Sequence, residues 1–170
     1  MKSINGEILT GKIFIYPTDT IYGLGCNAMD KIAVSKIKEI KKRSKDKPLS
    51  IIAPSLFWIK EHCYIDLDLS KYFPGPYTVV LKKKDINFLH WVASDDSLGV
   101  RIPDNSFTKK IQKSKVPFVT TSVNLSGQKP ITKISEIPEE IRKKVDIIID
   151  EGELSGRPST LIINGKEVKR

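Results

Sequence analysis

The sequence predicts an α/β (α+β) fold in which a twisted, mixed β-sheet is flanked by helices. Two observations lead to this prediction. Short runs rich in isoleucine and valine recur along the chain, and helical patterns separate some but not all of them, so strict strand–helix alternation is absent. With 170 residues, of which 39% are hydrophobic, the chain can bury a core, and we expect a single domain over residues 1–170.

Several short apolar runs, bounded by residues typical of turns, are expected to form strands. They cover residues 13–16, 49–53, 77–81, 98–102, 117–121, 146–150 and 160–164. Lys82-Lys83-Lys84 is expected to be the solvated end of the third of these strands. Asn164-Gly165 is typical of the turn of a terminal hairpin.

Two expected helices begin at good N-cap residues. Asp30 caps a helix from about residue 31 to 42, and Asn105 caps a helix that runs to about residue 114. In the first helix, lysines that include Lys38 are expected on a solvated face, opposite an apolar face made of Ala33, Ile37 and Ile40. Further short helices are expected within residues 54–73 and 134–143.

The composition limits the class of protein. There is no apolar run near the roughly 20 residues that span a bilayer, and the N-terminus lacks the apolar core of a signal peptide, so we expect a cytoplasmic protein. The two cysteines form no CxxC pair and the two histidines have no metal-binding spacing, so we expect no metal site and no Ser-His-Asp triad.

The net charge of +9 has two interpretations. A basic surface is typical of a protein that binds nucleic acid or polyphosphate. Alternatively, the excess lysine reflects the codon usage of an AT-rich genome and lies on solvated faces. Arginine is scarce in this chain, and a retained arginine indicates a place where the planar guanidinium is needed.

Five polar segments join small hydroxyls or glycines to the ends of expected strands. They are PTDTIYGLG (17–25), KKRSKDKPLS (41–50), SLGVRIP (97–103), TTSVNLSG (120–127) and SGRPST (155–160). Ligands of open α/β sheets bind in the crevice beyond strand ends. Since five such segments exceed what turns require, together they predict a binding site.

The charged and polar side chains of these segments indicate which ligands would bind. Lys41, Arg43 and Lys47 could neutralise phosphate oxygens, while Ser122, Asn124 and Ser126 supply neutral contacts. Arg101 interrupts an apolar strand, so it needs an anionic partner from the protein or from a ligand carboxylate. No histidine lies beside any of the serines, which favours a site that positions charged substrates over covalent catalysis.

Two local questions remain open at this level. Lys41 and Arg43 point about 200° apart on a continuous helix, so both reach one ligand only if the helix ends near Lys42. The alternative is a frayed basic helix end that interacts with the helix dipole. For Asp19, a local turn contact is favoured over a water-mediated metal contact.

The ordered set PTDTIYGLG, Lys41-x-Arg43 with KPLS, PGPYTVVL (74–81), GVRIP, TSVNLSG and GRPSTL resembles the YrdC-like family, the threonylcarbamoyl-AMP synthases, in its single-domain branch. The resemblance covers about residues 5–165 and is specific as a set. It implies that L-threonine, bicarbonate and ATP, with Mg²⁺ carried by ATP, are converted to threonylcarbamoyl-AMP and pyrophosphate. No tightly bound cofactor is implied. The product would pass to a tRNA threonylcarbamoyl transferase complex, and weak tRNA binding is compatible with this role.

The family's functional residues carry over onto matching positions. The family's Lys-Arg-Ser-Asn set, which holds nucleotide phosphates and carbamate, corresponds here to Lys41, Arg43, Ser122 and Asn124. Further positions near ATP correspond to Lys47 and Ser97. The positions that contact threonine correspond to Thr20, Arg101, Thr121 and Ser159. In this reading the hydroxyls of residues 17–25 line an amino-acid pocket, and the glycines there let the backbone approach the ligand.

Two departures and two alternatives complete the prediction. The chain ends at Arg170, so the C-terminal domain of longer relatives is expected to be absent, and Ile52 stands where some relatives carry a histidine. A sister group shares the fold but lacks parts of the four-residue set that is intact here. The alternative function is an RNA-binding protein for tRNA or rRNA maturation, although no RRM or KH signature is present. A related carbamoyl transferase is disfavoured because zinc-finger cysteines are missing.

Overall fold

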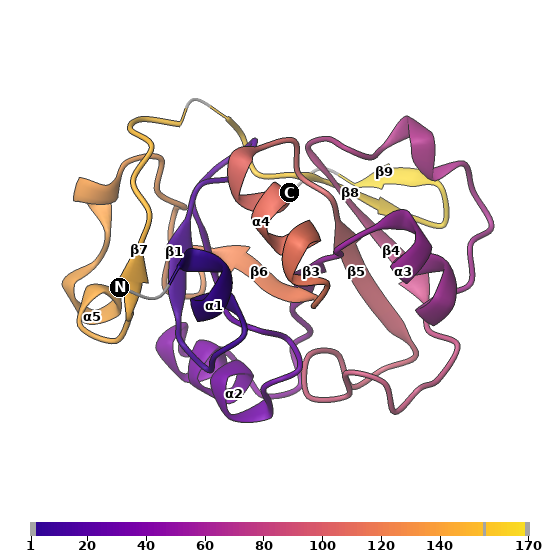
Figure 1. The fold of residues 1–170 in the computed structure, drawn as a ribbon, viewed down its shortest axis with the longest axis horizontal. Coiled ribbons are helices and arrows are strands. Elements are labelled where there is room, and N and C mark those ends of the chain that lie inside the picture. The colour runs from indigo at the N-terminus through magenta and orange to yellow at the C-terminus, as the bar shows by residue number, and fades with distance from the viewer. Residues whose placement is uncertain (1–2, 155, 169–170) are drawn as a thin grey trace.

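The computed structural model describes residues 3–154 and 156–168, and it confirms the predicted fold class. Within these residues, nine strands form one mixed sheet in the order β7-β1-β2-β6-β3-β5-β4-β8-β9 (Figure 1). The strands are β1 (Phe14–Tyr16), β2 (Gly23–Gly25), β3 (Ser50–Ile52), β4 (Tyr77–Lys82), β5 (Ser97–Arg101), β6 (Phe118–Ser122), β7 (Ile147–Ile148), β8 (Thr160–Ile163) and β9 (Lys166–Val168). The pairs β1–β7, β3–β5 and β4–β8 are parallel, and the other neighbouring pairs are antiparallel.

The helices are short and lie at the margins and faces of this sheet (Figure 1). They are α1 (Ile4–Ile8), α2 (Lys31–Ile40), α3 (Leu56–His62), the 3₁₀ helix η1 (Leu69–Lys71), α4 (Ser106–Ser114), the 3₁₀ helix η2 (Ile134–Glu136) and α5 (Glu139–Arg142). None of the helices in the described part of the chain is both long and apolar enough to cross a membrane.

Both predicted N-caps are confirmed. The side chain of Asp30 accepts a hydrogen bond from Ala33 N (2.9 Å), and that of Asn105 accepts one from Thr108 N (3.0 Å). Each satisfies a backbone donor that the first turn of a helix leaves unpaired. The helix expected over residues 134–143 is instead two short pieces, η2 and α5, because Pro138 precedes α5 and cannot donate a backbone hydrogen bond.

The two faces of the sheet pack against different helices. Since alternate residues of a strand point to opposite faces, consecutive residues such as Ile51 and Ile52 enter different buried clusters. One cluster joins α1 and α4 to the sheet and consists of Ile8, Phe14, Tyr16, Ile52, Phe107, Ile111 and Phe118. The larger cluster includes Ile13, Ile15, Ile51 and Val119 of the sheet region, Ala33, Val34 and Ile37 of α2, and Ile59 of α3.

Strand β2 was not expected, because its sequence, Gly-Leu-Gly, has low β propensity. Tertiary contacts explain the glycines. A Cβ on Gly25 would lie 1.8 Å from the carbonyl oxygen of Val119, and a Cβ on Gly23 would lie 2.8 Å from the ring of Tyr16. The prediction that these glycines let the backbone approach a ligand is therefore wrong for Gly25, which makes room for the neighbouring strand.

Two lysines expected on solvated surfaces are buried. Lys38, predicted on the polar face of α2, is 8% exposed, and its Nζ donates to the carbonyl of Lys45 (2.6 Å). Lys83, predicted in the solvated end of a strand, is 3% exposed. Its Nζ donates to the carbonyls of Ile86 (2.8 Å), Phe88 (3.3 Å) and Ala93 (2.9 Å), so it ties together the irregular segment before β5.

The predicted terminal hairpin is present and completes one edge of the sheet. Strands β8 and β9 pair antiparallel around Asn164 and Gly165, both of which have positive φ. The segment between β7 and β8 crosses from one side of the sheet to the other, because these strands lie near opposite ends of the strand order (Figure 1).

Candidate functional site

Two adjoining cavities lie at the predicted site, and they share one wall. The first, of about 340 Å³, is lined by Thr18, Ile21, Tyr22, Gly23, Ser50, Thr78, Arg101, Thr120, Thr121, Ser122, Pro130, Pro158 and Ser159. The second, of about 500 Å³, is lined by Arg43, Pro48, Leu49, Ser50, Val80, Ser97, Gly99, Thr120, Thr121, Ser122, Leu161 and Ile163. Residues that line both form the shared wall, and they are Ser50, Thr120, Thr121 and Ser122.

Small side chains on one face of the sheet create this hollow. Ser50 is paired with Thr120 of β6 and with Gly99 of β5, and Gly23 is paired with Ser122. Directly paired residues share a face, so these five lie on the face that carries α1 and α4. Where β1, β3 and β6 carry large apolar side chains on that face, helices cover them. Where the side chains are small, space remains for a ligand.

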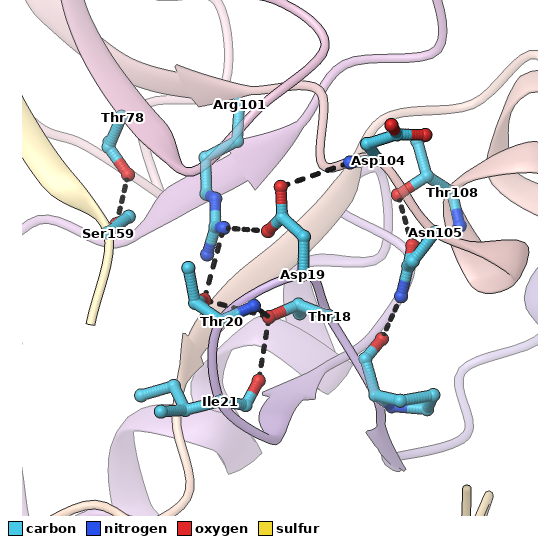
Figure 2. Close-up of polar contacts among 11 residues, drawn as sticks. Thr18, Asp19, Thr20, Ile21, Thr78, Arg101, Asp104, Asn105, Thr108 and Ser159 are labelled. Carbon is cyan, nitrogen blue, oxygen red and sulfur yellow. Dashed lines mark hydrogen bonds and ion pairs between the residues drawn. The ribbon is translucent and has the colours of Figure 1, made fainter. Parts of the chain in front are cut away.

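The first cavity is lined by a buried arginine, Arg101, whose guanidinium is bonded to Asp19 and Thr20. Arg101 is 6% exposed, and its Nη2 lies 2.8 Å from Oδ1 of Asp19 and 3.3 Å from Oγ1 of Thr20 (Figure 2). The second carboxylate oxygen of Asp19 accepts a hydrogen bond from Asp104 N (3.1 Å). The anionic partner required by Arg101 is thus present in the protein, and the local turn contact predicted for Asp19 is replaced by a long-range ion pair.

The loop before β2 is fixed by hydroxyl pairs and by the start of α4. Oγ1 of Thr18 lies 2.9 Å from Oγ1 of Thr20 and donates to the carbonyl of Ile21 (Figure 2). Asn105, the N-cap of α4, donates from its side-chain amide to the carbonyl of Pro17. On the opposite wall, the hydroxyls of Thr78 and Ser159 lie 2.8 Å apart.

The segment that leads into β8 passes closely over this loop. A Cβ on Gly156 would lie 2.1 Å from the carbonyl oxygen of Thr20, so only glycine fits at this crossing. The close approach brings Pro158 and Ser159 to the wall of the first cavity. The segment 155–160 therefore joins the site as predicted, with Ser155 outside the described residues.

Beside the second cavity, α2 ends at Ile40, close to the end near Lys42 that both side chains would need to reach one ligand. Lys41 is the C-cap, Lys42 has a φ of +51°, and Arg43 N donates to the carbonyl of Lys38 (2.9 Å). This is the pattern of a Schellman motif, which reverses the chain direction after a helix. Lys41 and Arg43 are therefore not confined to opposite sides of a continuous helix.

Lys41 lies behind the shared wall and is 2% exposed. Its Nζ donates to the carbonyl of Ser122 (2.6 Å), the carbonyl of Asn124 (2.9 Å) and the side-chain oxygen of Asn124 (2.8 Å). These three acceptors match the three protons of an ammonium group. Burial, and secondarily the charge of Arg43, lowers the pKa of Lys41 to about 8.

The loop after β6 is organised around this ammonium group. The hydroxyl of Ser122 lies 2.6 Å from the side-chain oxygen of Asn124, and the amide nitrogen of Asn124 donates to the carbonyl of Gln128. The backbone N and the hydroxyl of Ser126 both donate to the carbonyl of Lys41 (3.1 Å each). Lys41, Ser122 and Asn124 thus form one hydrogen-bonded cluster.

Arg43 reaches the second cavity. Its Nη2 donates to the carbonyl of Pro48 (2.9 Å), while its Nε is buried without a hydrogen-bond partner among the described residues. Burial lowers the pKa of Arg43, although a guanidinium stays protonated in proteins. A buried donor with no protein partner leaves Arg43 able to bind an anionic ligand.

The predicted site residues fall into three groups. Those that line a cavity are Arg43, Ser97, Arg101, Thr121, Ser122 and Ser159. Lys41, Asn124 and Thr20 lie behind the walls, bonded to lining residues. Lys47 is exposed and outside the lining of both cavities.

Sequence reasoning missed several lining residues. Thr18, Ser50 and Thr120 lie inside segments that were singled out, and their position at strand ends was the available signal. Thr78 lies within β4, where no local feature distinguishes it from a core residue. In the part of the chain described by the structure, no three histidine, cysteine or acidic residues gather as a metal site.

The family model Sua5_yciO_yrdC, described as "Telomere recombination", matches residues 7–169. A protein of Methanocaldococcus jannaschii, named a candidate threonylcarbamoyl-AMP synthase, is 40% identical over 95% of this chain and 79% of its own length. The threonylcarbamoyl-AMP synthase of Pyrococcus abyssi is 34% identical over 92% of this chain, which spans about half of that enzyme (48%).

Solved structures agree with these relatives. The crystal structure of P. abyssi Sua5 complexed with L-threonine superposes with a TM-score of 0.80 at 33% identity, over 94% of this chain and 49% of that one. E. coli YciO superposes with a TM-score of 0.80 at 26% identity, over 94% of this chain and 81% of that one. The match of sequence and fold over nearly the whole chain shows that this protein belongs to the Sua5/YciO/YrdC family.

Proposed function

We propose that this protein is a threonylcarbamoyl-AMP synthase, which condenses L-threonine, bicarbonate and ATP to threonylcarbamoyl-AMP and pyrophosphate. The observation that carries the proposal is the pair of adjoining cavities, one containing Arg101 and the other Arg43, with a shared wall of small hydroxyl residues. A reaction that brings the carboxylate of an amino acid and the phosphates of a nucleotide close together needs two adjoining subsites that each contain a cationic side chain. The names of the relatives support the same activity.

The first cavity would bind L-threonine. Arg101 would bind the carboxylate, since its guanidinium is already oriented by Asp19 and reaches the cavity wall. Thr121 and Ser159 line the same cavity and would contact the remaining polar groups. Thr20 would act from behind the wall, through its contact with Arg101.

The second cavity would bind ATP, with Mg²⁺ carried by the phosphates. Arg43 would contact phosphate oxygens, and Ser97 and Ser122 would add neutral contacts. Lys41 and Asn124 would hold Ser122 in place, and the ammonium group of Lys41 would contribute positive charge behind the wall. The exposed Lys47 would reach the nucleotide only from the rim.

The chemistry would take place at the shared wall. The neutral amine of threonine and bicarbonate form a carbamate and release water. A carbamate oxygen then attacks the α-phosphorus, a new P–O bond forms, and the bond to the bridging oxygen breaks to release pyrophosphate with Mg²⁺. The displacement requires positioning and charge neutralisation, which this chain supplies without a covalent nucleophile.

Three finer statements belong to this proposal. The product would supply the threonylcarbamoyl group for an adenosine of tRNA, through a tRNA threonylcarbamoyl transferase complex. The protein would act in the cytoplasm, where ATP and tRNA are available. Residues 1–170 would fold as one domain.

The decisive test is pyrophosphate release from MgATP, measured with and without L-threonine and with and without bicarbonate. Release that requires both co-substrates, together with mass-spectrometric detection of threonylcarbamoyl-AMP, is the expected result. Release that is independent of threonine would indicate ATP hydrolysis. No release, with ATP binding still measurable by calorimetry, would contradict the proposal and favour the other activities of this fold.

A further inference from the structure

We propose that the hydroxyl of Ser50 is a further substrate-contacting group, which donates a hydrogen bond to the carbamate at the junction of the two cavities. The inference rests on the proposed function and adds a residue to it. Ser50 is the first residue of β3, a central strand with β6 on one side and β5 on the other. It is one of the residues that line both cavities.

The position of Ser50 follows from the pairing register. Ser50 lies opposite Thr120 of β6 and opposite Gly99 of β5, and all three are on the face of the sheet that floors the cavities. The carbamate forms from threonine in the first cavity and attacks the α-phosphorus in the second. Its oxygens must therefore pass the wall that the two cavities share.

Gly99 leaves open the space that the Ser50 hydroxyl occupies. A Cβ on Gly99 would lie 2.5 Å from Oγ of Ser50 and 3.2 Å from its Cβ. Any larger residue at position 99 would displace the hydroxyl or be displaced by it. The pair therefore keeps one small polar group, the Ser50 hydroxyl, in this part of the floor.

Several neighbouring hydroxyls are engaged within the protein, whereas that of Ser50 has no partner among the described residues. Thr78 and Ser159 are bonded to each other, and Ser122 is bonded to Asn124. For Oγ of Ser50, the described residues offer no hydrogen-bond partner, and the residue is half-buried. A hydroxyl that faces a cavity without a protein partner is available to a ligand.

The chemistry of the carbamate suits such a donor. A carbamate carries one negative charge over two oxygens, of which one attacks phosphorus and the other does not. A hydrogen bond from Ser50 to the second oxygen would orient the first toward the nucleotide. Ser50 keeps its proton throughout, so this contact adds no proton-transfer step.

The test compares Ser50→Ala with the wild-type protein at saturating ATP and L-threonine while bicarbonate is varied. Loss of one hydrogen bond to a charged group should lower kcat/KM for bicarbonate about ten- to hundredfold. Calorimetric affinities for L-threonine alone and for ATP alone should stay within about twofold of wild type, because Ser50 contacts the carbamate and neither separate substrate. Ser35→Ala, at an exposed position of α2, is the matched control and should change none of these values.

The possible results distinguish a wrong inference about Ser50 from a wrong proposed function. If Ser50→Ala has the wild-type bicarbonate dependence, the inference is wrong while the proposed function stands. If threonine affinity falls as much as kcat/KM, Ser50 contacts the amino acid instead, and the inference is also wrong. If the wild-type protein releases no pyrophosphate, the proposed function itself fails and the inference falls with it.

Discussion

The guanidinium of Arg101 and the carboxylate of Asp19 form an ion pair with an Nη2–Oδ1 distance of 2.8 Å, although 82 residues separate them in the chain. The side chains are 7% and 12% exposed, so water screens the pair poorly. Asp19 bridges Arg101 to the backbone of Asp104 at the start of α4 (Figure 2). The arginine is therefore oriented before any ligand arrives, and such preorganisation lowers the entropy lost on binding.

Arg101→Ala should raise the KM for L-threonine by about tenfold or more, because it removes a charged hydrogen bond to the substrate carboxylate. Asp19→Asn should raise KM by a smaller factor, since the guanidinium remains but loses its anionic partner. Initial rates of pyrophosphate release against threonine concentration provide the measurement. Arg142→Ala, whose side chain bonds the carbonyl of Ile134 outside both cavities, serves as control. An unchanged KM in Arg101→Ala would assign this arginine a structural role.

Lys41→Ala and Arg43→Ala should both abolish formation of the adenylate, but for different reasons. Removing Lys41 breaks three hydrogen bonds in a largely buried cluster, so the melting temperature should also fall. Within the described residues, Arg43 donates a single hydrogen bond, to the carbonyl of Pro48, so Arg43→Ala should lose ATP affinity with little loss of stability. Calorimetric ATP titration and thermal unfolding of both variants separate these effects. Near-normal turnover of Arg43→Ala would contradict its contact with phosphate, and near-normal turnover of Lys41→Ala would contradict its support of Ser122.

The lowered pKa of Lys41 predicts a specific pH dependence of stability. The pKa is about 8 in the folded protein and about 10.4 in an unfolded chain, so the unfolded chain binds more protons between these values. Linkage then makes the Lys41 contribution to the free energy of unfolding rise with pH across this window, with no slope below it. Lys41→Met has no titratable group at this position, so it lacks this pH-dependent contribution. Urea unfolding of both proteins at pH values of about 7, 8 and 9 measures the effect. The free energy of unfolding of the wild type should rise with pH relative to that of the variant. Parallel curves would show that Lys41 titrates at its ordinary pKa.

Lys83→Ala should destabilise the fold far more than Lys82→Ala. Lys83 is buried and donates to three carbonyls, and the loss of that donor should lower the free energy of unfolding by more than about 2 kcal/mol. Lys82 is largely exposed and has one long ion pair with Asp96 (3.9 Å), so its removal should change stability by less than about 0.5 kcal/mol. Chemical denaturation of the two neighbouring variants measures the difference. Equal free energies of unfolding would mean that the three carbonyls bind water in place of Lys83 with no loss of stability.

Much of the fold could be predicted because its signals are local. The caps at Asp30 and Asn105 act within three residues, and the apolar runs of β3, β5 and β6 have few other structures available to them. The polar segments after these strands also indicated where the cavities lie. Arg43, Arg101 and Ser122 were assigned to the site on this basis, Ser97 was assigned from the family resemblance, and all four line its cavities.

Other features depend on residues far apart in the chain, and the sequence alone could not supply them. The glycines of β2 are set by the ring of Tyr16 and the carbonyl of Val119, and Lys83 is buried because a later segment folds its carbonyls around it. Likewise, Arg101 is held by Asp19, and the Ser50 hydroxyl reaches the shared wall because Gly99 lies beside it. Local sequence determined the helix caps and most of the strands, with β2 as the exception. Only the pairing of distant strands decided which side chains meet, since register and crossing segments are fixed by packing over the whole molecule.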